Sequence, residues 1–343
     1  MKHAGTQMIK TDRLTLRRIE LDDAEMMFRN WANDEEVTRY LRWLPHKDVD
    51  ETRKIIQEWF ENYKNDYTYH WGICLEDGEM IGSIGIIITE YDYKADVGYC
   101  IGRNWWGKGY TSEAVKAVIN YMFINTDIER IEAYHSVKNP ASGKVMLNAA
   151  MVYEGHARHK YKNHDGFQDS DMYGIVREMW EVQNEIAYYN ALPFVFDDFI
   201  EVPELSDGVI YLTCKKKTPA IPDKKWVPGY ILNICKDGEA IGEVALRIGY
   251  TDGLYYGGQI AYNVDENYRG NGYAVRACRL LLLIAKAHGM IKLLITNNHT
   301  NKASMRVCEK LGARLIRTTS LPEWHDLYKE GQRLQNIYEW NVE

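Results

Sequence analysis

The sequence predicts two α/β domains in tandem, each an α+β three-layer fold in which helices flank a mixed central sheet. The chain has 343 residues, which is too long for one ordinary domain and suits two domains of roughly 150 to 180 residues. Two stretches nearly repeat each other, since NWWGKGYTSEA at 104–114 returns as NYRGNGYAVRA at 267–277. Short alternating strands and amphipathic helices succeed one another around both stretches, as this fold class requires.

Three landmarks show that the repeat covers a whole domain. The separations are 160 residues from Asp77 to Asp237, 163 from Asn104 to Asn267, and 162 from Asn139 to Asn301. Landmarks in the same order at nearly constant spacing indicate tandem duplication, because a solenoid repeat would be far shorter. We therefore predict a first domain at 1–182, a partly helical connector at 183–200 and a shortened second domain at 201–343.

The elements follow the same order in both copies, except near the start of each. The first copy begins with a strand at 13–18, helical segments near 22–32 and 50–63, and a hairpin at 73–82. A strand, the glycine loop, a helix, a strand, a second helix and two closing strands follow. The second copy reaches its hairpin through TPAIPDKKWVP, whose prolines prevent a long helix. Leu16 matches Leu212 at an offset of 196, against 160 at the hairpin, so the second copy lacks about 36 residues there.

Composition excludes several classes of function. A net charge of −7 and an isoelectric point of about 5.9 argue against nucleic-acid binding and allow a cationic acceptor such as an amine. No apolar run approaches 18 residues and the first residues lack a secretory pattern, so we expect no membrane span. The six cysteines are scattered and the ten histidines form no ligand spacing. We therefore expect reduced thiols, no metal site and a cytoplasmic location.

A glycine pair between a strand and a helix is suited to holding a phosphate. Glycines allow left-handed dihedrals and close approach, and the free N–H groups of a helix start attract anions. A dinucleotide-binding loop would need a third glycine, where the copies have Ser112 and Val275, and neither copy carries the P-loop pattern. On these residues alone, a plain tight turn remains the alternative.

The surroundings of the glycine pair are more specific than the pair itself. In both copies Asn-x-x-Gly-x-Gly follows a strand, and a helix, a strand and an Asn-x-x-Ser helix start come next. This arrangement resembles the GNAT superfamily of acyl-CoA-dependent N-acyltransferases, although the family's motif begins with Gln or Arg where these copies have Asn104 and Asn267. The first copy, from TDRLTLRRIELDDAEMMF to DMYGIVREMW, is similar to the Rim-type branch, which acetylates the N-termini of ribosomal proteins. The second copy is similar from GEAIGEV to GARLI.

The resemblance implies two tandem GNAT domains and an enzyme that transfers an acetyl group from acetyl-CoA to a primary amine. The acceptor would be a protein N-terminal α-amine or a small amine, including an aminoglycoside or a polyamine. It implies no nucleic-acid or membrane partner. The protein would be a monomer or a homodimer, with the two copies packing together as a pseudo-dimer.

The resemblance also implies which residues would hold acetyl-CoA. In the first copy, the strand backbone would meet the pantetheine arm, the glycine loop would cradle the pyrophosphate, and the following asparagine would meet the pantetheine. These residues are Cys100, Ile101, Asn104, Trp105, Trp106, Gly107, Lys108, Gly109, Thr111, Ser112 and Asn139. The matching set in the second copy is Asn263, Val264, Arg269, Gly270, Asn271, Gly272, Ala274, Asn301 and Ser304, where Arg269 would add a cation near the phosphates.

Family members often use a carboxylate on the strand before the loop as general base, and Asp96 lies there in the first copy. Glu90 and Asp92 are weaker candidates. Neutralising a lysine amine at pH 7 costs roughly 4.6 kcal/mol, against about 1 kcal/mol for an α-amine, so an ordinary carboxylate suits an α-amine better. Ser142 would lie near the sulfur, and Tyr173 is a reserve proton donor. Helix capping is the alternative role of Ser142 and of Ser304.

The second copy has Gln259 where the first has Asp96, and a glutamine side chain is no proton acceptor. It also lacks the helical segments that wall the acceptor site in the family. The alternative to two working enzymes is therefore that residues 201–343 form a non-catalytic acyl-CoA-binding or scaffolding module.

Overall fold

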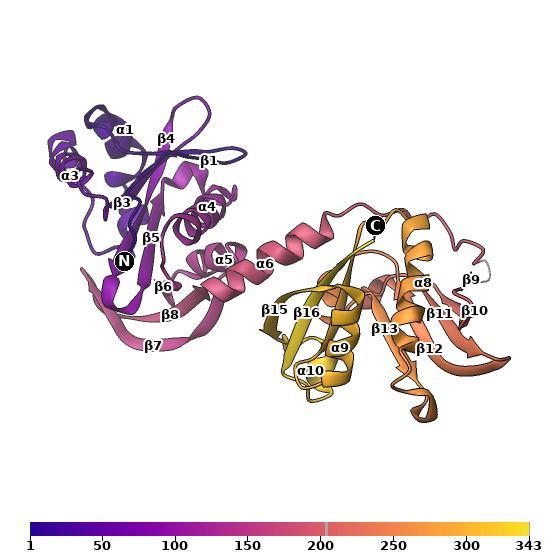
Figure 1. The fold of residues 1–343 in the computed structure, drawn as a ribbon. Coiled ribbons are helices and arrows are strands. Elements are labelled where there is room, and N and C mark those ends of the chain that lie inside the picture. Colours follow the sequence, from indigo (N-terminus) through magenta and orange to yellow (C-terminus); the bar gives the residue numbers. More distant parts are fainter. Residues whose placement is uncertain (203–204, 343) are drawn as a thin grey trace. The chain divides into compact units, whose positions relative to one another are not determined.

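The computed structural model describes residues 1–202 and 205–342, drawn as a ribbon in Figure 1. The chain divides into two compact units, Met1–Glu181 and Val182–Glu343, hereafter the first and the second unit. Each unit has its own hydrophobic core of buried side chains. No helix in the described ranges is long and apolar enough to cross a membrane.

The first unit is built on one eight-stranded sheet with the strand order β1-β2-β3-β4-β5-β6-β8-β7. Neighbouring strands are antiparallel except β5 and β6, which run parallel. The strands are β1 (Ile9–Lys10), β2 (Thr15–Arg17), β3 (Tyr69–Cys74), β4 (Met80–Thr89), β5 (Lys94–Ile101), β6 (Arg130–Ser136), β7 (Val152–Asn163) and β8 (Gly166–Val176).

Helices cover both faces of this sheet, as the three-layer prediction requires (Figure 1). One face carries α4 (Tyr110–Asn125) and α5 (Pro140–Asn148), whose apolar residues join the main core of the unit. The other face carries a smaller core around the fully buried Trp31 and Ile56. Its helices are α1 (Ala24–Met27), the π-helical η2 (Phe28–Ala32), α2 (Glu35–Thr38) and α3 (Val49–Asn62).

The sheet of the first unit is interrupted at its centre. The parallel strands β5 and β6 pair at only three positions, of which the last is Asp96 with Glu132. Beyond Asp96, β5 continues to Ile101 without a ladder to β6, so backbone groups on both strands lack sheet partners there.

In the second unit the same interruption divides the sheet completely. One sheet has the order β13-β12-β11-β10-β9 and the other β14-β16-β15. The strands are β9 (Leu205–Ser206), β10 (Tyr211–Thr218), β11 (Gly229–Lys236), β12 (Glu239–Arg247), β13 (Ile260–Val264), β14 (Lys292–Asn298), β15 (Arg314–Ser320) and β16 (Leu334–Asn341). The helices are α7 (Asp252–Gly257), α8 (Tyr273–Ala287), α9 (Lys302–Leu311) and α10 (Asp326–Lys329).

Residues 183–200, expected as a connector, pack into the second unit. Helix α6 (Arg177–Asn190) starts before the boundary between the units, and its Tyr189 is buried in the second core. The Tyr189 hydroxyl donates a 2.8 Å hydrogen bond to Glu339. Phe196 and Phe199 pack against the same core, so this segment stabilises the second unit by burying apolar surface.

Candidate functional site

The glycine loop has the same backbone geometry in both units. Gly107 and Gly109 have φ angles of 71° and 82°, and Gly270 and Gly272 have 84° and 78°. A left-handed backbone strains any residue with a side chain, which explains the glycines. Helix α4 begins directly after Gly109 and α8 directly after Gly272. The first N–H groups of each helix have no intrahelical acceptor and point at the loop, which favours an anion there.

Two side chains tie the loop to the preceding strand. The Trp106 indole N–H donates a 2.8 Å hydrogen bond to the carbonyl oxygen of Ile101. Arg269 Nε makes the equivalent 2.8 Å bond to Val264. Arg269 also pairs with Glu266 at 3.4 Å, so the cation expected beside the phosphates is engaged with the protein itself.

The remaining loop residues lie around these anchors. Thr111 and Ser112 are half-buried in the first turn of α4. Ala274 occupies the position in α8 that corresponds to Thr111. Asn271 donates to the Tyr268 carbonyl at 3.1 Å. Asn104 and Trp105 lie in the short helical turn η4 (Arg103–Trp105), and Lys108 lies between this turn and α4.

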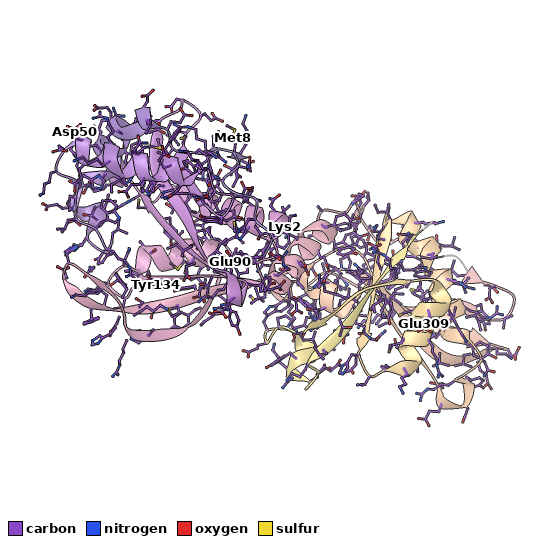
Figure 2. All side chains as sticks on the ribbon, turned by 60° about the vertical axis from the view of Figure 1, so that its left-hand side comes forward. Lys2, Met8, Asp50, Glu90, Tyr134 and Glu309 are labelled. Atoms are coloured by element: carbon purple, nitrogen blue, oxygen red, sulfur yellow. The ribbon has the colours of Figure 1, made fainter. Side chains whose placement is uncertain are left out.

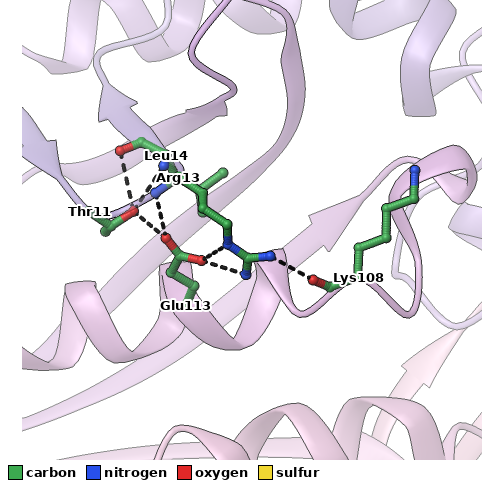
Figure 3. Close-up of polar contacts among 5 residues, drawn as sticks. All are labelled: Thr11, Arg13, Leu14, Lys108 and Glu113. Atoms are coloured by element: carbon green, nitrogen blue, oxygen red, sulfur yellow. Dashed lines mark hydrogen bonds and ion pairs between the residues drawn. The ribbon is translucent and has the colours of Figure 1, made fainter.

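A polar latch fixes the loop of the first unit to the start of the sheet (Figure 3). Arg13 Nε donates to Glu113 of α4 at 2.7 Å, and Arg13 Nη1 donates to the Lys108 carbonyl at 3.0 Å. The Thr11 hydroxyl donates to the same carboxylate at 2.6 Å. Burial alone would raise the pKa of Glu113, but the hydrogen bonds from Thr11 and Arg13 outweigh it and lower the pKa. The carboxylate therefore stays charged and holds the loop through Arg13.

The second unit has a latch at the same place with the charges exchanged. Arg276 of α8 occupies the position of Glu113, and it donates to Asp207 at 2.7 Å. Asp207 also accepts the Ile210 N–H at 3.0 Å, as Thr11 accepts the Leu14 N–H at 3.0 Å. No loop carbonyl is engaged by this pair among the described residues, so only the first latch holds its glycine loop directly.

The pairing of β4 with β5 determines which backbone groups face the interrupted ladder. The Gly102 N–H bonds the Ile81 carbonyl at 2.8 Å, which makes Ile101 opposite Gly82 a non-hydrogen-bonded pair. Ile101 and Tyr99 therefore direct N–H and C=O groups toward β6. Cys100, a predicted contact, instead pairs with Ser83 of β4, so the structure favours Tyr99 in its place.

The second unit repeats this pattern. The Asp265 N–H bonds the Ile241 carbonyl at 3.0 Å, so Val264 and Tyr262 direct their backbone groups toward the interruption. Asn263, predicted as a contact, pairs with Glu243 instead.

Asp96 lies at the last paired position before β5 and β6 diverge. Its neighbours Ala95 and Val97 point into the core under α4, so Asp96 points to the opposite face of the sheet. Partial burial, and next the negative charge of Glu132, raise the pKa of Asp96, while Lys94 and Lys160 oppose the shift. A carboxylate with a raised pKa at an opening in the sheet has the properties of a general base.

Glu132 supplies the fixed negative charge beside Asp96. It accepts hydrogen bonds from Lys94 at 2.8 Å and from Arg130 at 3.1 Å. Burial would raise the pKa of Glu132, but these bonds outweigh it and lower the pKa. The same face carries Tyr134 of β6, labelled in Figure 2, whose hydroxyl accepts a 2.9 Å hydrogen bond from Arg42.

Gln259, at the position of Asp96 in the second unit, is a structural residue. It is fully buried, its side-chain oxygen accepts the Leu294 N–H at 2.6 Å, and its amide donates to the Gly249 carbonyl at 3.2 Å. Its own N–H bonds the Leu294 carbonyl at 2.8 Å. Gln259 thus joins the two separated sheets, and its side chain has no role left for a ligand.

Each Asn-x-x-Ser serine is paired with a half-buried tyrosine that was not among the predicted site residues. The hydroxyls of Ser142 and Tyr99 are 2.8 Å apart, and those of Ser304 and Tyr262 are 2.7 Å apart. Burial raises the pKa of both tyrosines, so both stay protonated at neutral pH. Both tyrosines could have been found from the sequence, because ADVGYCIG and GQIAYNVD carry a tyrosine at the same position of the repeat.

The two preceding asparagines differ in availability. Asn301 caps α9, because its side-chain oxygen accepts the Ser304 N–H at 3.1 Å. Asn139 caps α5 without a side-chain hydrogen bond and has no side-chain partner among the described residues. Both polar ends of the Asn139 side chain are therefore free to meet a ligand, whereas the side-chain oxygen of Asn301 is already bonded within the protein.

Tyr173 lies on β8 beside a buried histidine that the sequence analysis missed. Its ring centroid is 5.6 Å from that of His135, whose Nε2 is buried without a partner. Gly143 lies against both, since a Cβ there would be 2.5 Å from His135 Nε2 and 2.9 Å from the Tyr173 hydroxyl. Burial raises the pKa of Tyr173, which keeps its proton available. Tyr173 is thus on the α5 side of the sheet, with Ser142 and Tyr99.

Comparison with known proteins identifies the architecture. The family described as "Acetyltransferase (GNAT) domain" matches residues 13–152, and that described as "Acetyltransferase (GNAT) family" matches residues 197–313. The protein "Uncharacterized N-acetyltransferase p20" of Bacillus licheniformis is 35% identical over 176 residues, which are 50% of this chain and 97% of that protein. This chain belongs to the GNAT acetyltransferases. It is a tandem duplication of the GNAT domain and an N-acetyltransferase.

Other similar proteins carry more specific names. The "[Ribosomal protein uS5]-alanine N-acetyltransferase" of Escherichia coli is 28% identical over 160 residues, which are 44% of this chain and 80% of that protein. A solved structure titled RimL, a ribosomal L7/L12 α-N-protein acetyltransferase in complex with coenzyme A, has 22% identity and a TM-score of 0.46. The match covers 50% of this chain and 98% of the chain in that structure.

Membership of the GNAT acetyltransferases implies acetyl-CoA as the cosubstrate, and the residues of the first unit fit it. Two glycines at positive φ, the free N–H groups at the start of α4 and the latch at Lys108 form a fixed anion-binding turn. The backbone groups of Tyr99 and Ile101 and the unpartnered Asn139 amide are placed to meet the extended arm.

Proposed function

We propose that the first unit transfers the acetyl group of acetyl-CoA to a primary amine and that Asp96 is its general base. The observation that carries the proposal is the position of Asp96, at the last paired residue before β5 and β6 diverge, with a pKa raised by burial and by Glu132. Bound acetyl-CoA supplies the thioester carbonyl that the amine attacks directly.

The protein first has to neutralise the acceptor. Asp96 accepts a proton from the acceptor ammonium, and the negative charge of Glu132 favours both the arrival of the cation and its transfer of a proton. Lys94 and Arg130 hold Glu132 ionised, so the pair keeps one fixed charge and one exchangeable proton.

The residues proposed to stabilise the leaving sulfur lie on the opposite face of the sheet from Asp96. Ser142, fixed by Tyr99 at 2.8 Å, and Tyr173 both carry hydroxyl protons on the α5 side. We assign to Ser142 a hydrogen bond that stabilises the departing thiolate, with the Tyr99 hydroxyl keeping its orientation and Tyr173 as the second hydrogen-bond donor. The acylated nitrogen loses the proton that the thiolate takes up.

The acceptor is an amine of modest pKa. A carboxylate with a raised pKa neutralises an α-amine of pKa about 7.8 at a cost of about 1 kcal/mol at pH 7, far less than a lysine requires. A protein N-terminus or a small amine therefore fits best. The name of the Escherichia coli relative, a ribosomal protein uS5 alanine N-acetyltransferase, supports the first of these.

The second unit does not share the base, because Gln259 is fully buried and both ends of its amide are bonded. We propose that it is a binding or scaffolding module in which acetyl transfer does not occur.

The test is acetyl transfer by Asp96→Asn, with Asp92→Asn as the matched control on the exposed turn nearby. Asp96→Asn should lower kcat about 10²- to 10⁴-fold without changing the KM for acetyl-CoA, while Asp92→Asn keeps wild-type rates. Wild-type kcat in Asp96→Asn would exclude Asp96 as the base.

A further inference from the structure

A partly buried arginine of the second unit has no anionic partner. Arg247 is the last residue of β12, and its Nη1 donates one hydrogen bond, to the Gly258 carbonyl at 3.1 Å. Within the described residues it forms no ion pair, and burial is the one cause that shifts its pKa. A guanidinium has five N–H donors, so four remain unused.

Comparable arginines elsewhere in the chain are paired. Arg17 makes two bonds to Asp23, at 2.7 and 2.8 Å, and Arg317 binds Glu185 at 2.7 Å. Burial lowers the pKa of Arg247, and no acidic group opposes that shift. A cation held in this way costs stability unless a partner arrives.

Arg247 also lies beside the residue that corresponds to the proposed general base of the first unit. Its N–H bonds the Gln259 carbonyl at 2.9 Å, and Gln259 is the counterpart of Asp96. Leu246 points into the core, so Arg247 points to the other face, the one on which the first unit carries Asp96.

The charged groups around this position therefore differ between the units. The first unit presents Asp96 and Glu132, whereas the second has Gln259 and Leu294 at those positions and adds Arg247. A cationic amine would be repelled here, and an anion would be attracted.

We infer that the second unit has an anion-binding site at Arg247, where the free side of its guanidinium binds a carboxylate. The planar fork of a guanidinium matches a carboxylate in a two-bond pair. A monoanion is preferred over a phosphate dianion because one guanidinium supplies one positive charge, and Lys216, on the same face, lies two strands away on β10. This inference does not depend on the acetyl transfer proposed for the first unit.

The test follows hydrogen exchange of the peptide 257–262 in the full chain, with sodium acetate against sodium chloride at equal ionic strength. Acetate should slow exchange in wild type and have no effect in Arg247→Met. Lys215→Met is the matched control, because Lys215 is another cation of the same sheet but already pairs with Glu243. It should keep the acetate effect.

Two further measurements test the site even if Arg247→Met alters the fold. Arg247→Lys keeps the charge but loses the fork, and should need about tenfold more acetate for the same protection. Without acetate, Arg247→Met should melt about 2–4 °C higher than wild type, because an unpaired cation is removed. The inference is wrong if acetate does not protect wild type, if it protects Arg247→Met equally, or if phosphate protects more than acetate.

Discussion

At the scale of single residues, the chemistry of the first unit depends on how Asp96 and Glu132 share one partly buried environment. Lys94 and Arg130 hold Glu132 ionised through hydrogen bonds of 2.8 and 3.1 Å. Partial burial of Asp96 and the negative charge of the neighbouring Glu132 raise the pKa of Asp96. The same surroundings thus produce one permanent anion and one proton acceptor.

The first prediction concerns pH. A base works only when deprotonated, so kcat/KM should fall as the pH drops through the raised pKa of Asp96, above the range of an ordinary aspartate. Glu132→Gln removes the neighbouring negative charge and should move this acidic limb to lower pH. Lys94→Gln removes an opposing positive charge and should move it to higher pH. A pH–rate profile measures both, and shifts in the same direction would contradict the assignment.

The second prediction concerns the close packing at Gly143. A Cβ there would be 2.5 Å from His135 Nε2, so Gly143→Ala should lower the free energy of unfolding of the first unit by about 1–3 kcal/mol. Gly98→Ala is the control, because a Cβ at Gly98 meets nothing within 4 Å and should change stability by less than about 0.5 kcal/mol. Urea unfolding measures both, and equal effects would show that the contact at Gly143 is unimportant.

Some of these residues could be found from the sequence and others could not. Asp96 and the serines follow from their places in a repeated motif, and Tyr99 was visible in the same repeat. His135 was not, because its interest comes from a buried, unpartnered Nε2 beside Gly143. The structural role of Gln259 was hidden too, since it depends on two strands that fail to pair.

At the scale of elements, the glycine loop is held differently in the two units. In the first, Arg13 connects Glu113 of α4 to the Lys108 carbonyl across the start of the sheet (Figure 3). In the second, Arg276 and Asp207 join the corresponding elements, and the loop itself is held by side-chain hydrogen bonds of Asn271 and Arg269. The helix start was predictable from Asn-x-x-Gly-x-Gly, whereas the latch joins residues about 100 positions apart and leaves no local pattern.

The third prediction tests the latch. Loss of the latch in Arg13→Ala should weaken acetyl-CoA binding by about 1 kcal/mol, which raises the KM for acetyl-CoA about fivefold. The kcat should stay within about twofold of the wild-type value. Arg53→Ala removes an exposed pair with Asp50 on α3 and should change neither constant. Steady-state kinetics in acetyl-CoA decides, and an unchanged KM in Arg13→Ala would mean that the loop needs no latch.

At the scale of the whole molecule, duplication explains why one chain has two cores, and it was readable from the constant offsets. What the offsets did not reveal is that residues 183–200 belong to the second core. Tyr189 bonds Glu339 from helix α6, and Glu185 of the same helix binds Arg317. The sequence pattern of this stretch, aromatic and partly helical, fits a connector equally well.

The fourth prediction follows from this placement. A fragment of residues 177–343 should fold, whereas a fragment of residues 201–343 should melt at a lower temperature or aggregate, because it lacks Tyr189, Phe196 and Phe199 and leaves apolar surface exposed. Thermal unfolding followed by circular dichroism compares the two. Equal melting temperatures would show that residues 183–200 are a linker.

The central claim, that Asp96 of the first unit deprotonates the acceptor, is tested most directly by varying the acceptor. The loss of kcat/KM in Asp96→Asn should be measured at neutral pH for primary amines of decreasing pKa. The account predicts a loss of about 10²-fold or more for amines that are ammonium ions at the assay pH. The loss should shrink toward none for amines that are already neutral. A loss of the same size for every amine, or no loss for any, would contradict it.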